Sequence, residues 1–302
     1  MRAPHVLQHT LSGPAAFAGV GVHTGERVRA IIRPGPVDSG VVFVRTDVTD
    51  RDNRVPVRAH AVRPSALNTQ IANAADVRVS TIEHLMAAFA ALSVDNVVVE
   101  LDGPELPIMD GSAAPFVALI DKAGRRVQDM PRGFIEILKP IEVLHGRKRA
   151  ALLPLAGSAP VLEVDYEIEF PSAAIGRQQL RLVVDETAFR NELAAARTFG
   201  FTHEVEALRA RGLALGGSLD NAIVVEGDRV LNPEGLRFTD EFVRHKALDA
   251  IGDLYVLGAP VIGRFEGRYA GHGINNALVR ALAARPEAWR LRSFAEELAE
   301  AV

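Results

Sequence analysis

The most informative absence in this sequence of 302 residues is cysteine, which does not occur once. The chain therefore has no disulfide framework, no thiol nucleophile and no cysteine-ligated metal, so any metal must be held by His, Asp or Glu. A basic excess is also missing: the net charge of -4 argues against a general nucleic-acid binder and predicts no nucleic-acid partner. No apolar run approaches the length of a membrane span, so we expect no integral membrane segment.

Several motifs are absent as well. No Gly-x-Ser-x-Gly elbow occurs, and the sequence around Ser218 does not fit one, which argues against a serine hydrolase. Residues 19–25 are rich in glycine, but the glycine spacing is wrong for a dinucleotide fingerprint and a strand pattern follows. Residues 1–14 carry one Arg and no continuous apolar core, so we expect no secretory signal and a cytoplasmic protein.

The residues that are present predict an α+β fold. The chain is 48% apolar and 24% charged, which is typical of a soluble globular protein. In residues 27–33, apolar and arginine side chains alternate as in a strand with one buried face. Ser80 and Glu83 form a capping-box pattern before an apolar helix. The strands expected elsewhere are 41–44, 97–101, 134–143, 150–155, 161–170, 178–184 and 261–269, and the helices are 80–92, 112–123, 186–196, 204–211, 241–257 and 275–284.

These elements form a weak internal repeat. When His84 is placed on His245, each histidine opens an apolar helix that leads to a strand and then to a further helix. Each half therefore has strands followed by helices, which is an α+β order. Because residues 125–132 are polar and include a proline, we place a domain boundary there. The prediction is two similar α+β domains packed together, residues 1–127 and 128–302.

The helix predicted over 241–257, with Thr239 or Asp240 as its cap, carries the most suggestive polar residues. His245, Asp249 and Asp253 are spaced four residues apart and so share one face. Such a face can supply two metal ligands and a spare carboxylate, or it can be a solvated polar face.

A catalytic zinc usually takes three protein ligands and leaves one position for water. His84 is the best candidate for the third ligand beside His245 and Asp249, because it opens the matching helix of the other half; a packed or capping histidine is the alternative. Glu83 beside it has the composition of a base that could take a proton from metal-activated water.

Other residues fit supporting roles, each with a plain alternative. His272 stands between two glycines after a predicted strand, where it could protonate a leaving amine or lie in an ordinary turn. Asp253 could orient that imidazole and favour its charged form. Lys246 could meet developing negative charge or be a surface lysine. Thr198 stands beside two aromatic residues that could simply pack in the core.

Taken together, these stretches resemble the zinc-dependent UDP-3-O-acyl-N-acetylglucosamine deacetylases of lipid A synthesis. The resemblance spans nearly the whole chain, with the motifs in the same order. They are residues 19–25, 80–85, 107–112, 197–201, 215–218, 245–253 and 271–272.

The resemblance implies two similar domains, each a β-sheet packed with helices, with the active site between them. It also implies a role for each residue. The zinc ligands would be His84, His245 and Asp249, although ferrous iron would also suit them. Glu83 would be the general base, His272 the general acid and Asp253 its supporting carboxylate. Thr198 would stabilise the oxyanion, Lys246 and Phe199 would contact substrate, and Lys148 would be the best match for a diphosphate contact. The fatty-acyl passage would follow residues 201–224, and His23 would lie near the site.

The expected reaction is hydrolysis of the 2-acetamido group of a UDP-linked, 3-O-acylated glucosamine by a monomer, with release of acetate. One alternative is a metal-dependent hydrolase of another acylated amine or nucleotide. A second is a non-catalytic binding protein on the same fold. That protein would be expected to have lost one of five residues, and all five are present: Glu83, His84, His245, Asp249 and His272.

Overall fold

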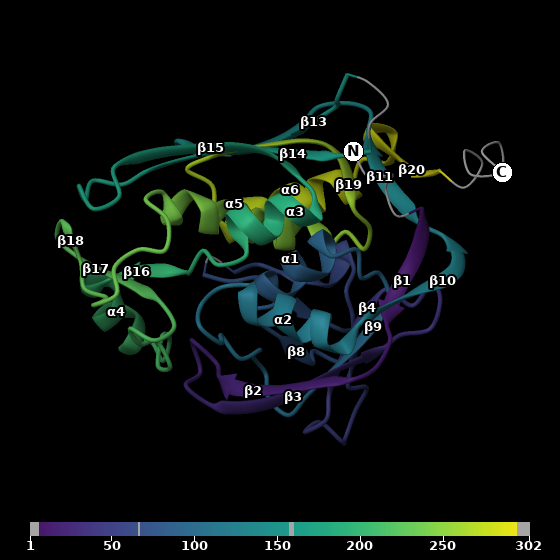
Figure 1. The fold of residues 1–302 in the computed structure, drawn as a ribbon, viewed down its shortest axis with the longest axis horizontal. Helices are drawn as coiled ribbons and strands as arrows, with labels where there is room; N and C mark the ends of the chain where they lie inside the picture. The colour runs from purple at the N-terminus through teal and green to yellow at the C-terminus, as the bar shows by residue number, and fades with distance from the viewer. Residues whose placement is uncertain (1–5, 66, 157–159, 295–302) are drawn as a thin grey trace.

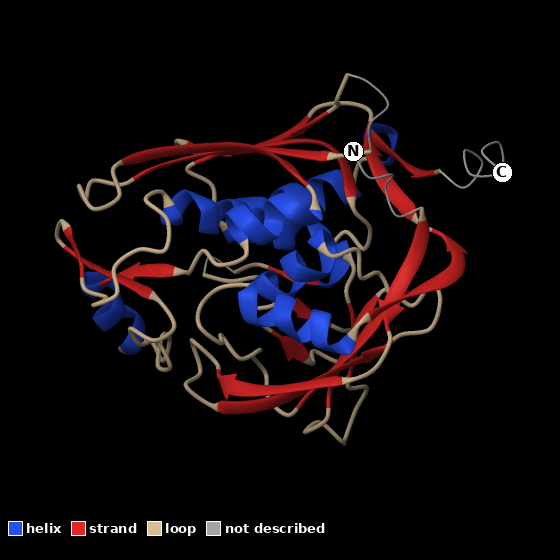
Figure 2. Cartoon of the chain, in the orientation of Figure 1, coloured by secondary structure: helices blue, strands red, loops and turns tan. Residues whose placement is uncertain are grey.

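The computed structural model describes residues 6–65, 67–156 and 160–294, so residues 1–5 of the amino-terminal segment lie outside it. The predicted α+β class is confirmed: several sheets surround a layer of helices (Figure 2). Figure 1 shows α1, α2, α5 and α6 between one sheet that contains β2 and β3 and another that contains β14 and β15. Within the described part of the chain, no helix is both long enough and apolar enough to cross a membrane.

The first sheet comes from the amino-terminal half and has the strand order β2-β3-β9-β4-β5. Its β3 shows the predicted alternation, since Val28, Ala30 and Ile32 are buried while Arg27 and Arg29 are exposed. A small sheet, β6-β7-β8, stands beside it. The strands are β2 (Ala15–Val20), β3 (Arg27–Pro34), β4 (Val41–Arg45), β5 (Arg54–Pro56), β6 (Val62–Arg63), β7 (Gln70–Ala72), β8 (Arg78–Val79) and β9 (Val97–Leu101).

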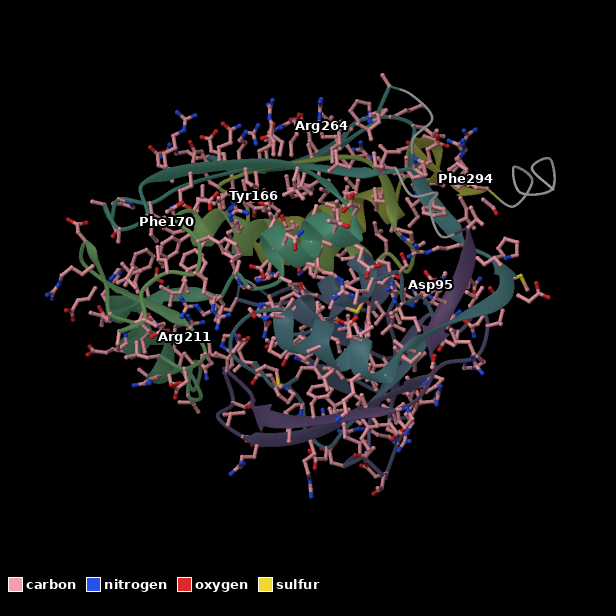
Figure 3. The ribbon with its side chains drawn as sticks, in the orientation of Figure 1. Asp95, Tyr166, Phe170, Arg211, Arg264 and Phe294 are labelled. Atoms are coloured by element: carbon pink, nitrogen blue, oxygen red, sulfur yellow. The ribbon has the colours of Figure 1, made fainter. Side chains whose placement is uncertain are left out.

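The second sheet comes from the carboxy-terminal half. It runs β12-β13-β19-β11-β20, and β14 pairs with both β19 and β15. Tyr166 of β14 is fully buried on the helix side, whereas Arg264 of β19 extends from the outer face (Figure 3). The strands are β11 (Gly133–Ile137), β12 (Ile141–His145), β13 (Lys148–Leu153), β14 (Leu162–Glu169), β15 (Arg177–Val184), β19 (Val261–Arg268) and β20 (Trp289–Ser293).

The two sheets share one strand order. In the first, β9 is antiparallel to β3 and parallel to β4, and these lead outwards to β2 and β5. In the second, β19 is antiparallel to β13 and parallel to β14, and these lead outwards to β12 and β15. Each central strand also follows one helix of the layer and precedes another. This topology agrees with the internal repeat expected from His84 and His245.

The polar stretch at the expected domain boundary is a strand. β10 (Arg125–Pro131) pairs antiparallel with β1 (Leu7–Leu11). Pro131 stands at its end, where a missing N–H interrupts the pairing least. The strand that connects the two halves, β10, is thus paired with β1 from near the start of the chain.

The position of α1 between the sheets follows from its almost complete burial. In α1, eight of nine residues are buried, and a helix that is apolar all round belongs in a core. Gly252 lets α5 approach α1: a Cβ at this position would lie 2.0 Å from the Glu83 carbonyl oxygen. The helices are α1 (Glu83–Ala91), α2 (Ala114–Ala123), α3 (Glu186–Ala188), α4 (Thr202–Arg209), α5 (Glu241–Tyr255) and α6 (His272–Ala283).

The predicted capping box before α1 is wrong. The helix begins at Glu83, and Ser80 Oγ instead donates a hydrogen bond to the Pro104 carbonyl at 3.2 Å. The Glu83 carboxylate turns inward and accepts from the Thr69 backbone N–H at 3.0 Å. Between them, Thr81 has a φ of 57°, a left-handed conformation that directs the chain away from capping geometry.

The ends of other helices also differ from the prediction. Neither Thr239 nor Asp240 caps α5, because the Asp240 carboxylate pairs with Arg244. Ser112 lies before α2 and its Oγ accepts from the Ala114 N–H at 3.2 Å. The helix expected over 186–196 is a short α3 followed by a π-helical turn, Phe189–Leu193.

A separate lobe extends from the second half beside the open end of the helix layer (Figure 1). It consists of α4 and the three-stranded sheet β16-β17-β18, with β16 (Phe199–Phe201), β17 (Ile223–Glu226) and β18 (Arg229–Val230). This lobe contains the stretch 201–224, the fatty-acyl passage expected from the resemblance. Phe201 is buried within it, whereas His203 is exposed.

Candidate metal centre and active site

A polar stripe along α5 is buried. Glu241, His245, Asp249 and Asp253 follow one another at intervals of four residues, and none is more than 1% exposed. The sequence pointed to the last three; the solvated polar face considered as the alternative is wrong. Buried polar groups need partners, and each residue of this stripe contacts a polar group of a neighbouring segment or of α5 itself.

His84 joins this stripe from α1, the helix that packs against α5. His84 Nε2 lies 3.5 Å from Asp249 Oδ1, and His245 Nε2 lies 3.2 Å from the same oxygen. The ligand atoms of the three residues all lie within 4.8 Å of one another, and all three side chains are buried. The predicted set of two imidazoles and one carboxylate therefore forms a buried metal-binding site.

The chemistry of these side chains fits a divalent cation. Asp249 Oδ1 is buried and makes no hydrogen bond to any described residue, so it is an acceptor without a donor. His245 Nδ1 lies 3.0 Å from the Ala196 carbonyl oxygen, which fixes Nδ1 as the protonated nitrogen and leaves the Nε2 lone pair for a metal. Burial lowers the pKa of His245 to about 3, which keeps the ring neutral.

Lys246 contacts the other oxygen of the same carboxylate. Its Nζ donates to Asp249 Oδ2 at 2.7 Å and also lies 5.7 Å from the centre of the Phe199 ring. Lys246 is therefore not the free surface lysine considered as the alternative. The ion pair fixes the carboxylate so that Oδ1 faces the two imidazoles.

Glu83 lies beside this centre and is only 3% exposed. Its Oε2 accepts from the Thr69 N–H, and its Oε1 lies 3.7 Å from His272 Nε2. Burial raises the pKa of Glu83, although the nearby His272 and His84 oppose the shift. A carboxylate with a raised pKa and one oxygen facing the site is suited to accepting a proton.

His272 stands opposite Glu83. It is the first residue of α6, not part of a flexible turn as the flanking glycines suggested. Its Nδ1 lies 3.1 and 3.0 Å from the two oxygens of Asp253, and its Nε2 lies 3.5 Å from Asp249 Oδ2. Burial by itself lowers the pKa of His272, but the three neighbouring carboxylates outweigh it and raise the pKa to about 9. A bound cation would offset part of the Asp249 contribution, while Asp253 would still favour the imidazolium.

Thr198 and Phe199 lie where the lobe meets α5. The Thr198 N–H donates to the Gly111 carbonyl at 2.8 Å, and its own carbonyl accepts from the Ile223 N–H at 2.7 Å. The Phe199 ring packs edge-on against Phe242, with centres 5.0 Å apart, and lies 6.5 Å from the His245 ring. Within the described residues the Thr198 hydroxyl makes no hydrogen bond, so it is free to meet a ligand.

Lys148 and His23 differ in how closely the structure associates them with the metal centre. Lys148 begins β13 and is exposed, and among the described residues it forms no ion pair with the buried cluster. His23 is half-buried in a loop. Its backbone N–H donates a hydrogen bond to the carboxylate of the fully buried Glu105 at 3.0 Å. Burial lowers the pKa of His23, with Glu105 opposing and His272 adding to the shift.

The residue at the start of the α5 stripe was missed by the sequence reasoning. Glu241 Oε1 accepts from Arg197 N and Nε at 3.0 and 2.9 Å, which anchors the segment leading to Thr198. Extending the four-residue spacing back by one turn from His245 would have found it. No comparable signal marks Thr69, whose hydroxyl hydrogen-bonds Asp253, or Asn275, whose amide donates to the same carboxylate at 2.9 Å.

Removal of Glu241 should destabilise the fold. In Glu241→Ala the Arg197 guanidinium would stay buried without its main partner, which costs about 3–5 kcal/mol of unfolding free energy. Urea denaturation would measure the loss. Glu234→Ala is the matched control, because this carboxylate pairs with the same arginine but is 54% exposed and should contribute less than about 1 kcal/mol. Equal losses in the two variants would contradict the assignment.

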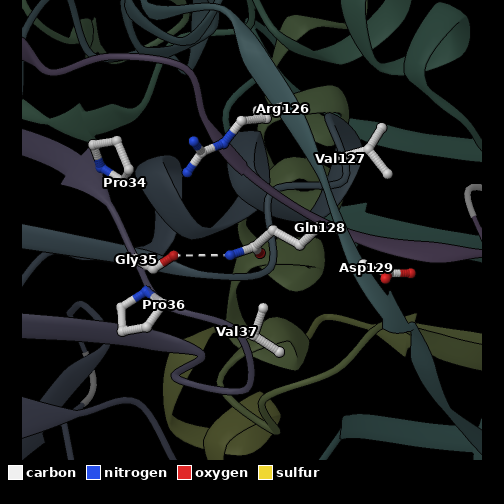
Figure 4. Close-up of a pocket in the computed structure, with 8 residues that line it drawn as sticks. All are labelled: Pro34, Gly35, Pro36, Val37, Arg126, Val127, Gln128 and Asp129. Carbon is white, nitrogen blue, oxygen red and sulfur yellow. Dashed lines mark hydrogen bonds between the residues drawn. The ribbon is translucent and has the colours of Figure 1, made fainter.

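A hollow on the surface lies apart from this centre. It has a volume of about 550 Å³ and is lined by residues 34–37, after β3, and 126–129 of β10. Gln128 crosses it to donate to the Gly35 carbonyl at 3.0 Å (Figure 4). None of the residues that line this hollow belongs to the buried polar cluster of the metal centre. We therefore assign the chemistry to the place where α1, α5 and α6 meet.

Comparison with known proteins agrees with this geometry. A model of the family LpxC, UDP-3-O-acyl N-acetylglycosamine deacetylase, matches residues 8–284. The UDP-3-O-acyl-N-acetylglucosamine deacetylase of Phenylobacterium zucineum (strain HLK1) is 66% identical over 297 residues, covering 98% of this chain and 100% of the relative. The protein of the same name from Shewanella frigidimarina (strain NCIMB 400) is 46% identical over 294 residues, or 97% and 94%. The chain therefore belongs to the UDP-3-O-acyl-N-acetylglucosamine deacetylase family.

Proposed function

We propose that this protein hydrolyses the 2-acetamido group of UDP-3-O-acyl-N-acetylglucosamine, giving the free amine and acetate, in lipid A biosynthesis. The observation that carries the proposal is the buried set His84, His245 and Asp249 with Glu83 and His272 on either side. His84, His245 and Asp249 would hold a divalent cation, which would supply Lewis acidity towards the amide carbonyl and lower the pKa of a bound water.

The protein's own residues move the protons. Glu83 accepts a proton from the attacking water through Oε1, because Oε2 is already held by the Thr69 N–H. His272 carries its proton on Nε2, which faces Glu83 and Asp249, and donates it to the departing amine. Asp253 binds His272 Nδ1 and so keeps the imidazolium charged and oriented.

Other side chains bind the substrate and the developing charge. The Thr198 hydroxyl, which has no partner among the described residues, donates towards the oxyanion of the tetrahedral intermediate. Lys246 and Phe199 lie beside each other and contact the substrate, and Lys148, exposed at the start of β13, meets the diphosphate. The 3-O-acyl chain follows the lobe formed by α4 and β16-β17-β18.

We propose zinc as the metal. Two imidazole nitrogens and one carboxylate oxygen, with a position left for water, are a usual catalytic zinc set. Two histidines and one carboxylate also suit ferrous iron. Metal analysis of protein purified without added metal distinguishes the two.

We further propose two similar domains, 1–127 and 128–302, with the active site between them. The shared strand order of the two sheets supports this division. So does the origin of the side chains, since Glu83 and His84 belong to the first part and His245, Asp249 and His272 to the second. We expect the protein to act as a cytoplasmic monomer on its UDP-linked substrate, without a nucleic-acid partner.

Removal of the metal provides the direct test. Chelator treatment should abolish acetate release from UDP-3-O-acyl-N-acetylglucosamine, and stoichiometric Zn²⁺ should restore it. A panel of other acylated UDP-sugars and nucleotides, assayed in parallel, checks the substrate. Substrate binding without turnover in zinc-replete protein would favour a non-catalytic binding role, and preference for another acylated amine would replace the proposed substrate.

A further inference from the structure

Thr69 touches both proton-transfer groups. It lies between β6 and β7 in the first half of the chain and is fully buried. Its backbone N–H donates to Glu83 Oε2 at 3.0 Å, and its hydroxyl hydrogen-bonds Asp253 Oδ1. Its carbonyl accepts from the Ile82 N–H at 3.4 Å, so the residue is held by its backbone on both sides. A single residue therefore contacts the proposed base and the carboxylate that supports the proposed acid.

The direction of the Thr69 hydroxyl is determined by a second partner. Asn276 Nδ2 donates to Thr69 Oγ at 2.9 Å. Since a hydroxyl has one hydrogen, and this contact uses an acceptor position of the oxygen, the hydrogen is directed towards Asp253.

Asp253 is held on both oxygens. Thr69 binds Oδ1 and Asn275 Nδ2 donates to Oδ2 at 2.9 Å, while His272 Nδ1 lies about equally far from the two, at 3.1 and 3.0 Å. Without the Thr69 hydroxyl, the only remaining partner of Oδ1 would be the His272 imidazole, which Oδ1 shares with Oδ2. The carboxylate could then rotate, and its rotation would move His272. A displacement of more than about 0.5 Å or about 10–20° is enough to misalign a proton donor.

We propose that Thr69 is a positioning residue: its hydroxyl fixes Asp253, and through it His272, relative to Glu83. The expected effect of Thr69 on kcat rests on the proposed function. Thr69 comes from the first half, whereas Asp253, His272 and Asn276 come from the second. The hydroxyl is thus the contact that aligns the acid, which the second half carries, with the base, which the first half carries.

The test replaces the hydroxyl by a methyl group of similar size. Thr69→Val keeps the backbone N–H to Glu83 and should lower kcat by about 10–100-fold, with KM changed less than about threefold and bound metal unchanged. Thr69→Ser restores the hydroxyl and should return kcat to within about threefold of wild type. If Thr69→Val does not fold, Thr69→Ala removes the same hydroxyl without adding a methyl group against Asp253.

Thr10→Val is the matched control. Thr10 is also fully buried, and its hydroxyl likewise donates once, to the Asn96 carbonyl at 2.6 Å, and accepts once, from the Gly35 N–H at 2.9 Å. Its loss should lower the melting temperature and leave kcat of the folded protein unchanged. Wild-type kcat in Thr69→Val, failure of Thr69→Ser to restore it, or an equal loss of kcat in Thr10→Val would each overturn the proposal.

A crystal structure separates this proposal from the proposed function. If wild-type protein releases no acetate from the UDP-sugar, the proposed function has failed, and the positioning role is judged from side-chain geometry. Asp253 and His272 displaced in Thr69→Val but not in Thr69→Ser would support it. Unchanged positions in both variants would overturn it.

Discussion

Asp249→Ala should yield folded protein that binds almost no metal and releases almost no acetate. Asp249 Oδ1 lies 3.5 Å from His84 Nε2 and 3.2 Å from His245 Nε2, and it accepts no hydrogen bond in the described structure. Its removal leaves two histidines, too few for a tight catalytic site. Since the metal contributes several kcal/mol to the reaction, the expected loss of kcat is at least about a thousandfold. Metal content by elemental analysis and acetate release measure the two effects.

The control for this variant is a surface aspartate. Asp121 is half exposed, and among the described residues its carboxylate pairs only with Arg190, so Asp121→Ala should retain one metal per chain and wild-type turnover. Normal metal content and normal deacetylation in Asp249→Ala would refute the ligand assignment. Loss of metal in both variants would point to a general loss of structure instead.

His272→Ala should separate metal binding from turnover. His272 Nε2 approaches Asp249 but is not part of the cluster of ligand atoms, so the variant should keep its metal. It loses the imidazolium that protonates the leaving amine, and general acid catalysis is worth about 10²–10⁴-fold in rate. We expect kcat to fall by this factor while KM changes little.

The exposed His145 on β12 provides the comparison. His145→Ala removes an imidazole without touching the buried cluster, and its kinetics should match wild type. Loss of metal in His272→Ala would show that His272 is a ligand. Turnover within about twofold of wild type would remove it from the proton-transfer scheme.

Much of the fold could be predicted because it follows from the local pattern of apolar and polar residues. β9 has the predicted bounds, and β3 has the predicted buried face, since alternation along a strand directly encodes which side meets the core. Helix ends were predicted less well. The Ser80–Glu83 pattern would cap an isolated helix, but here the Glu83 carboxylate binds the Thr69 N–H, a contact with a segment of the small sheet.

The tertiary contacts around Thr69 had no counterpart in the sequence. Its hydroxyl reaches a carboxylate 184 positions further along the chain, and neither residue type nor spacing marks the pair. The same holds for Gly252, whose missing Cβ is required only because α1 crosses α5 at that point.

Residue types and their spacing were enough to predict the class of chemistry. The absence of cysteine restricted any metal to His, Asp and Glu, and the helical spacing of His245, Asp249 and Asp253 put the right donors on one face. The role of each of these residues depends on how the helices pack against one another, which the spacing does not show. Asp249 faces His84 because α1 packs on α5, and Asp253 faces His272 because α6 begins one turn further along that helix. Helical spacing fixes which side chains are neighbours on one helix, whereas the partner of each depends on which other helix lies against it.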